Sequence, residues 1–348
     1  MDLSNIEYIK KFSNIDSFNM YETVLKFPDQ IEEALNGIKN ISLNKVPVRN
    51  IVISAMGGSS IAAEILTSIF SVELNIPVLI NRNYNIPEFV NQNTLFVPIS
   101  YSGNTEETLK AYNLANLKKA HVIAITSGGK LELSCKKNNQ ECLLLPRELQ
   151  ARSSFVFIFF AIYKILSEFC LISDKKNDIK DAVNTLKSLK TLWNQKIKYE
   201  KNPVKKTAVF LLDKIPVIYS TIGLLEKVCL RWKTQINENA KLFALINSFP
   251  ELNHNEIIPL TRKNILTDQI SILVLRDLNE SFELKKKVNL SIKLIRNHFQ
   301  CNEVYCWGKY PLTKALSLVY FGDLLSIYLA VLNDIDPTPI HEIDYLKK

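Results

Sequence analysis

Hydroxyl-bearing residues and glycines gather in three short stretches of the first half of the chain, each directly after an apolar run. The stretches are Met56–Ser60, Ser100–Thr108 and Thr126–Lys130, and five of the chain's nine glycines lie in them, at positions 57, 58, 103, 128 and 129. A helix-like run follows each stretch, so free N–H groups, a positive dipole end and hydroxyls favour a bound phosphate there. Because parallel strands end at one edge of a sheet, the pattern predicts a ligand crevice. The second stretch alone also fits an ordinary helix cap, since Ser or Thr followed by Glu is common at helix starts.

Two polar stretches in the second half carry groups that exchange protons. Glu238 stands among amide side chains in Lys233–Lys241, and His254 stands in Pro250–Glu256. Amides can orient a carboxylate, and histidine titrates near neutral pH, so both predict general acid–base chemistry. The alternatives are a solvated carboxylate at a helix end for Glu238 and a loop histidine bonded to backbone for His254. The remaining histidines are interpreted as structural: His121, His298 and His341.

Arg152 stands in a polar loop just before the most apolar stretch of the chain, Phe155–Ile172. A cation before a helix start is electrostatically unfavourable, because the positive end of the helix dipole lies there. The functional interpretation is that the guanidinium points into the crevice and binds an anion with its planar fork. The alternative is a contact with a surface carboxylate.

Short β-branched runs alternate with helical segments along both halves, which is typical of parallel sheets covered on both faces. The first half is expected to hold a helix at 20–37, strands at 50–55, 77–80, 94–99, 121–125 and 142–145, and helices at 60–71, 105–118 and 130–138. The second half is expected to hold strands at 207–211, 215–219, 243–248, 270–275 and 302–307, and helices at 222–233, 281–298 and 312–332. We therefore predict an α/β fold of two doubly wound parallel-sheet domains in tandem. The domains are 1–172 with the phosphate cradle and 206–348 with the acid–base residues, joined by a linker and helix at 173–205.

The composition is that of an ordinary globular protein. The chain has 348 residues, of which 47% are hydrophobic and 22% are charged, enough for two domains with their own cores. The net charge of +8 comes from scattered lysines without interleaved aromatic residues. This distribution argues against a nucleic-acid partner and leaves a general attraction for anionic substrates.

The cysteines and the apolar stretch indicate a cytoplasmic protein. Six cysteines show no metal spacing and no signal peptide precedes them, which predicts reduced thiols. The stretch 155–172 is interrupted by Lys164 and Glu168, and Ser153 and Ser154 can cap its start. We expect a buried core helix there and no membrane span.

The polar stretches together resemble the bifunctional phosphoglucose/phosphomannose isomerase family, whose members have two sugar isomerase (SIS) domains. The resemblance runs in order from about residue 50 to the C-terminus, over Met56–Ser59, Ser100–Thr108, Thr126–Leu131, Asn237–Asn239, Glu251–Glu256 and Asp336–Pro339. The serine-rich stretch alone is typical of any SIS domain, and the later segments are specific to this family. The resemblance therefore implies flavodoxin-like SIS domains.

The resemblance also implies an enzyme of glycolysis and gluconeogenesis that interconverts fructose 6-phosphate with glucose 6-phosphate and mannose 6-phosphate, without metal or cofactor. The implied phosphate-binding residues are Gly58, Ser59, Ser100, Ser102 and Thr105. Glu238 would move a proton between C1 and C2, and Arg152 would stabilise the enediolate. His254, entering from the partner subunit of a homodimer, would help to open the sugar ring, as would Lys347.

Three residues depart from the family pattern: Ala55 and Ser60, where Gly is usual, and Ala151, where Pro is usual. The side chain of Ser60 would narrow the phosphate cradle. Two alternative functions stay open. One is a non-catalytic sugar-phosphate-binding regulator, because a fold does not fix a function; the other is an aminosugar-phosphate isomerase.

Overall fold

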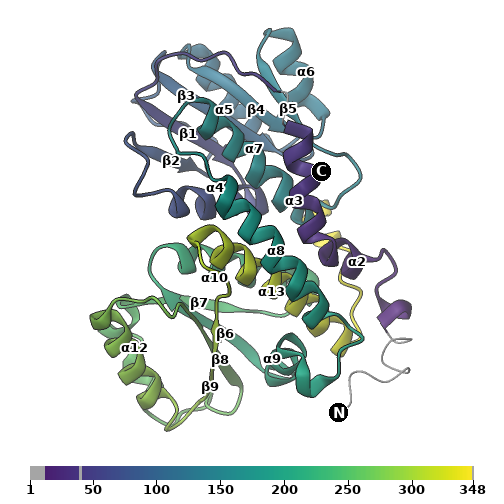
Figure 1. Ribbon diagram of the computed structural model, residues 1–348, viewed down its shortest axis with the longest axis vertical. Coiled ribbons are helices and arrows are strands. Elements are labelled where there is room, and N and C mark those ends of the chain that lie inside the picture. Colours follow the sequence, from purple (N-terminus) through teal and green to yellow (C-terminus); the bar gives the residue numbers. More distant parts are fainter. Residues whose placement is uncertain (1–11, 39–40, 347–348) are drawn as a thin grey trace. The chain divides into compact units, whose positions relative to one another are not determined.

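The computed structural model describes residues 12–38 and 41–346 (Figure 1). The chain divides into two compact units. The N-terminal unit is Asp29–Lys176, and the C-terminal unit combines residues 12–28 with residues 177–346. Residues 12–28, which the predicted first domain included, therefore belong with the second half of the chain.

The N-terminal unit is built on a five-stranded parallel sheet with the order β2-β1-β3-β4-β5. The strands are β1 (Asn50–Ala55), β2 (Val78–Asn81), β3 (Thr94–Ser100), β4 (His121–Thr126) and β5 (Glu141–Leu144). The helices are α3 (Phe27–Ile38), α4 (Gly57–Ile69), α5 (Glu106–Leu117), α6 (Gly129–Lys137), η1 (Ala151–Ser153) and α7 (Phe155–Glu168). The strand order reverses between β1 and β3, where ligands of such sheets commonly bind.

Helices cover this sheet because its central strands are apolar on both sides. Residues of α5 and α6 bury one face together with Val52, Phe96 and Val122. Helix α4 packs on β1 and β2 and against α7. Ten of the fourteen residues of α7 are buried, which confirms the predicted core helix over this stretch.

The C-terminal unit is built on a four-stranded parallel sheet with the order β7-β6-β8-β9. The strands are β6 (Ile215–Thr221), β7 (Leu245–Phe249), β8 (Ile270–Arg276) and β9 (Gln300–Tyr305). The longer helices are α8 (Lys176–Trp193), α9 (Pro203–Leu211), α10 (Leu224–Asn239), α12 (Phe282–Ile295) and α13 (Pro311–Leu332). The short ones are α2 (Met20–Leu25), η2 (Tyr199–Lys201), η3 (Glu251–His254), α11 (Ile257–Leu260) and α14 (His341–Leu346).

Helix α13 is the central helix of this unit and packs against α10, α9 and α2. Among the described residues it is the one helix long and apolar enough to cross a membrane, with a mean hydropathy of 1.9 over its most apolar window. Because 94% of that window is buried inside the protein, α13 serves here as core. Its neighbour α10 is fixed to it by a buried ion pair in which Arg231 donates two hydrogen bonds to Asp323, 2.9 and 2.7 Å long.

The predicted fold class is confirmed: both units are parallel α/β sheets. Two predicted elements differ: the single helix expected at 20–37 is two helices, α2 and α3, and residues 207–211 lie in α9 and not in a strand. Asn202 caps that helix by accepting hydrogen bonds from the N–H groups of Val204 and Lys205, and Pro203 stands in its first turn. This Asn-Pro start signal outweighs the β-branched composition that suggested a strand.

Candidate functional site

The turn after β1 opens α4 without a side-chain cap. The N-cap residue is Met56, whose side chain makes no cap hydrogen bond, and Gly57 adopts a positive φ of 51°. Gly58 and Ser59 lie in the first turn of the helix, where backbone N–H groups lack helical partners. The backbone of Arg152 lies beside this turn, since a Cβ on Gly58 would be 3.8 Å from the Cα of Arg152. The predicted phosphate-binding residue Gly58 and the predicted catalytic residue Arg152 are therefore neighbours.

Ser60, one of the three departures from the family pattern, is buried, with 1% of its surface exposed. Its hydroxyl donates to the carbonyl of Gly57, 2.8 Å away, and accepts a hydrogen bond of 3.0 Å from the Nε of Arg82. Arg82 also forms an ion pair with Glu64. The hydroxyl of Ser60 thus binds the helix backbone and an arginine at the end of β2. Nothing in the sequence pattern pointed to Arg82, which brings a second cation to this helix start.

The turn after β3 brings two hydroxyls together. The Oγ of Ser100 lies 2.8 Å from the Oγ1 of Thr105, and the N–H of Thr105 donates to Ser100 at 3.3 Å. Thr105 is the N-cap residue of α5, and its own side chain makes no cap hydrogen bond. Ser102 is exposed and accepts a bond of 3.3 Å from the N–H of Asn104. The ordinary helix-cap interpretation of this stretch therefore does not describe Thr105.

Glycines in the second and third turns let the two turns pack against each other. A Cβ on Gly103 would lie 1.8 Å from the carbonyl oxygen of Gly128, and one on Gly129 would lie 2.3 Å from that of Ser102. Both glycines also have positive φ, 69° and 71°. These glycines therefore have a packing role, because backbone meets backbone there.

We expect Gly103→Ala to lower the free energy of unfolding by more than about 1 kcal/mol, since the new methyl group meets a carbonyl oxygen in a left-handed turn. Gly37→Ala in α3 is the matched control, because no heavy atom lies within 4 Å of its added Cβ. The control should raise stability by about 0.5–1 kcal/mol. Thermal unfolding followed by circular dichroism distinguishes the two. Equal melting temperatures for both variants would contradict the packing role.

Arg152 lies in η1 and is buried, with 4% of its surface exposed. Its side chain is therefore enclosed by protein. The loop that leads to it is held by Tyr101, whose hydroxyl donates to the carbonyl of Pro146 (2.7 Å) and accepts from the N–H of Leu149 (2.9 Å). Burial raises the pKa of Tyr101, so this hydroxyl stays protonated. The second turn thus anchors the loop that carries Arg152.

The predicted side-chain cap of α7 is wrong, because its N-cap residue makes no side-chain hydrogen bond to the helix. Ser154 is the N-cap residue, but its hydroxyl donates to the carbonyl of Ala151 at 2.7 Å and does not cap the helix. This hydrogen bond joins the C-cap residue of η1 to the first residue of that short helix. The Ala at position 151 therefore still takes part in a tight turn before the helix, although the family usually has Pro there.

Glu238 lies in the last turn of α10 and is partly buried. Its neighbours fix the helix end: Asn239 donates to the hydroxyl of Ser326 (2.9 Å), and Asn237 accepts from the N–H of Ala244 (3.2 Å). Lys241 donates to the backbone carbonyl of Glu238. We expected amides to orient the carboxylate itself. The bonds described here hold the backbone that carries it.

His254 is exposed at the end of η3, in the loop that follows β7. An exposed side chain is free to reach another copy of the chain, as the resemblance implies. Lys347 lies outside the described residues. Among residues 12–38 and 41–346, no group of three or more His, Cys, Asp or Glu side chains is placed to hold a metal ion.

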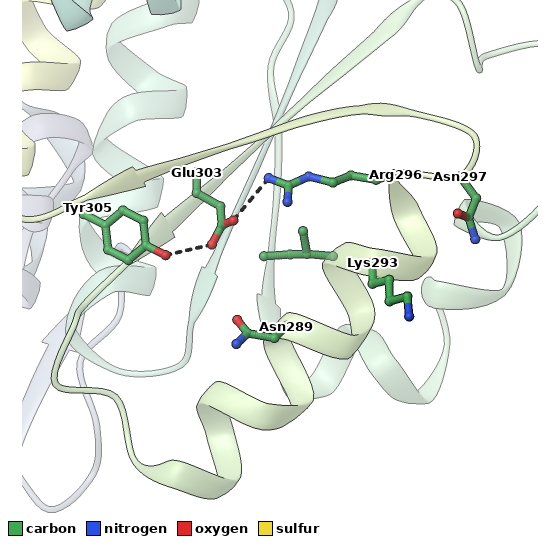
Figure 2. Close-up of a pocket in the computed structure, with 7 residues that line it drawn as sticks. Asn289, Lys293, Arg296, Asn297, Glu303 and Tyr305 are labelled. Carbon is green, nitrogen blue, oxygen red and sulfur yellow. Dashed lines mark hydrogen bonds and ion pairs between the residues drawn. The ribbon is translucent and has the colours of Figure 1, made fainter.

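A separate pocket of about 520 Å³ lies between α12 and β9 of the C-terminal unit (Figure 2). Glu303 projects into it and accepts hydrogen bonds from Arg296 (3.1 Å) and Tyr305 (3.0 Å). Arg276, buried behind it, also donates to Glu303 at 2.6 Å. None of the predicted site residues lines this pocket, and its carboxylate is fully engaged by cations and a hydroxyl.

Comparison with known families agrees with this architecture. Residues 46–163 match the SIS domain family, and residues 200–348 match the family of bacterial phospho-glucose isomerase C-terminal SIS domains. The fold and the hydroxyl-lined turns therefore define a protein of two SIS domains. A solved glucose-6-phosphate isomerase-like protein of Thermus thermophilus has the same fold, with a TM-score of 0.65 and 14% identity over 100% of this chain and 99% of that one.

Two relatives in sequence identify the family more specifically. A bifunctional phosphoglucose/phosphomannose isomerase of Caldicellulosiruptor bescii is 36% identical over 331 residues, which cover 94% of this chain and 98% of that protein. A D-glucosamine-6-phosphate 4-epimerase of Sulfolobus acidocaldarius is 30% identical over 241 residues, 69% of this chain and 71% of that protein. The chain belongs to the bifunctional phosphoglucose/phosphomannose isomerase family, which confirms the resemblance drawn from the polar stretches.

Proposed function

We propose that this chain is an aldose–ketose isomerase that interconverts fructose 6-phosphate with glucose 6-phosphate and mannose 6-phosphate through an enediolate. Family membership supports the reaction class. The observation that carries the proposal is the hydroxyl pair of Ser100 and Thr105 at the start of α5, beside the second uncapped helix start at Gly58 and Ser59. Hydroxyls and free helix N–H groups at the carboxyl edge of a parallel sheet suit a phosphate monoester.

The phosphate supplies binding energy away from the reacting carbons. Each charge-assisted hydrogen bond to it contributes about 1.5–3 kcal/mol, so bonds from Ser59, Ser100, Ser102 and Thr105 would contribute several kcal/mol before the entropy cost of binding. That energy holds C1 and C2 in place for proton transfer. Sugar phosphates are the substrate class that uses such a site.

Glu238, Arg152 and His254 provide the groups that the isomerisation needs. A carboxylate base takes the proton from C2 and returns it at C1, or the reverse, and a guanidinium stabilises the charge that develops on the enediolate oxygens. The imidazole of His254, contributed by the second subunit of a homodimer, moves a proton on the ring oxygen, together with Lys347. We place the enzyme in the cytoplasm.

Ser100→Ala is expected to raise KM for fructose 6-phosphate about tenfold, because one phosphate hydrogen bond and the Thr105 hydroxyl contact are lost. The same variant should weaken inhibition by inorganic phosphate to a similar degree, whereas kcat should change less than KM. Thr67→Ala in α4 is the control variant, because the hydroxyl of Thr67 donates to carbonyl groups of its own helix. Unchanged inhibition by phosphate in Ser100→Ala would place the phosphate elsewhere.

An aminosugar phosphate is the second candidate substrate, because one relative is named a D-glucosamine-6-phosphate 4-epimerase. A coupled assay with purified protein, offering glucose 6-phosphate, mannose 6-phosphate and glucosamine 6-phosphate separately, distinguishes the candidates. Turnover of glucose 6-phosphate or mannose 6-phosphate supports the proposal. Binding of these ligands without conversion would indicate a non-catalytic regulator instead.

A further inference from the structure

The loop that carries His254 contains a carboxylate held from two strands. The hydroxyl of Tyr219, in β6, donates a hydrogen bond to Oε1 of Glu256, and the Nδ2 of Asn247, in β7, donates to Oε2. Each carboxylate oxygen therefore has its own donor on a neighbouring strand of the sheet. Because β6 and β7 are hydrogen-bonded to each other, the two donors are fixed relative to one another.

The donor Tyr219 is buried, which restricts its motion and strengthens its hydrogen bond to Glu256. Tyr219 is 1% exposed and belongs to the hydrophobic core cluster under α12. Burial, and then the hydrogen bond to Glu256 and the charge of that carboxylate, raise the pKa of Tyr219, so its hydroxyl remains a proton donor at any physiological pH. A hydrogen bond to a carboxylate from a buried hydroxyl is stronger than one in water.

Two further anchors hold the same loop before His254. Leu252 is fully buried in the core cluster that includes Phe249. The Oδ1 of Asn253 accepts a hydrogen bond of 2.8 Å from the hydroxyl of Ser291, in α12. His254 itself is exposed. The chain is thus fixed at Asn253 and again at Glu256, with only His254 and Asn255 between them.

We propose that Glu256, held by Tyr219 and Asn247, is a positioning residue that fixes the loop so that His254 is presented for proton transfer to the sugar ring. The inference rests on the proposed function. With both flanking residues anchored, few backbone conformations are open to His254, so the imidazole is held near one place before the substrate arrives. Misplacement of a proton-transfer group by about 1 Å can cost about 100-fold in rate.

The anchors also explain why a carboxylate rather than an amide stands at position 256. The amide nitrogen of Asn247 can only donate, and the hydroxyl of Tyr219 donates here, so the carboxylate accepts at both ends. Gln presents one acceptor and one donor. If its oxygen faces Asn247, its NH₂ group faces Tyr219, whose hydroxyl must then accept, and both bonds lose the charge of the carboxylate. Glu256→Gln therefore weakens both anchors without removing the side chain.

The test is a double-mutant cycle with Glu256→Gln and His254→Ala, assayed with glucose 6-phosphate. We expect Glu256→Gln to lower kcat roughly 10- to 100-fold with KM within threefold. In the His254→Ala background the same change should cost less than about twofold, because the group it positions is gone. Binding of 5-phosphoarabinonate, an open-chain analogue that needs no ring opening, should be unchanged.

Tyr219→Phe provides a second route to the same loss and keeps the test decisive if Glu256→Gln folds poorly. Glu283→Gln, an exposed carboxylate in the first turn of α12, is the matched control with the same charge change. Equal losses in the presence and absence of His254, or wild-type kcat in both Glu256→Gln and Tyr219→Phe, would overturn the positioning role. Lack of isomerase activity in the unaltered protein would instead overturn the proposed function itself.

Discussion

Replacing Glu238 by Gln is expected to lower kcat for fructose 6-phosphate by about 10²- to 10⁴-fold, the range that a positioned general base contributes. Gln keeps the shape of the side chain, and the backbone of this helix end is held by neighbours that the change does not touch, among them Asn237 and Asn239. Binding of the open-chain analogue should therefore stay within a few fold. Steady-state kinetics and titration calorimetry measure the two effects separately.

Glu226→Gln is the matched control for this variant, because Glu226 lies in the first turn of the same helix and pairs with Lys227 at the surface. It should leave kcat and KM unchanged. Full turnover in Glu238→Gln would remove Glu238 from the reaction, and loss of analogue binding would give it a role in binding rather than in proton transfer. A retained exchange of the C1 or C2 proton with solvent would also contradict its role as the base.

The alternation of apolar runs and helical segments was sufficient to predict both sheets. Buried parallel strands such as Thr94–Ser100 are nearly uninterrupted apolar runs, which few other structures require. The strand predicted at 207–211 is wrong because the cap signal at Asn202 and Pro203 outweighs the β-branched composition that follows it. The packing of α2 against α13 has no signal in the sequence, because contacts between residues some 300 positions apart leave no local pattern.

The sequence predicts the hydroxyl-bearing turns, because clusters of glycine and serine directly after strands are typical of turns that bind ligands. The reason for each glycine was not visible. Gly103 and Gly129 serve turn-to-turn packing, which depends on the distance between β3 and β4. Whether a glycine admits a ligand or a neighbouring backbone is decided by tertiary structure, and the one-dimensional pattern is the same in both cases.

The residues that support the site were missed for a related reason. Arg82 reaches Ser60 across 22 positions, and Tyr219 reaches Glu256 across 37. Glu256 stands two residues after His254, in the same polar stretch, so its position gives a signal. Its partners could not be predicted, because they lie on two separate strands. Groups that position a side chain are recruited from wherever the fold places them, whereas groups that touch the substrate repeat as short motifs.

Asp323→Asn is expected to lower the free energy of unfolding of the C-terminal unit by about 3–5 kcal/mol. The carboxylate accepts two hydrogen bonds from Arg231 and one of 3.0 Å from Gln235, and the side chains of Arg231 and Asp323 are only 2% and 4% exposed. The variant leaves a buried guanidinium without its counter-charge. All three tryptophans, Trp193, Trp232 and Trp307, lie in this unit. Urea unfolding followed by tryptophan fluorescence therefore reports it separately.

The double variant Arg231→Met with Asp323→Leu separates the pair from the packing around it. Removing both charges leaves no uncompensated ion, so it should destabilise the unit less than Asp323→Asn does, with a residual cost from the unpaired amide of Gln235. Glu226→Gln, which breaks a half-exposed pair on the same helix, should change stability by less than about 0.5 kcal/mol. If the double variant were less stable than Asp323→Asn, the ion pair would not be what fixes α10, and with it Glu238, to α13.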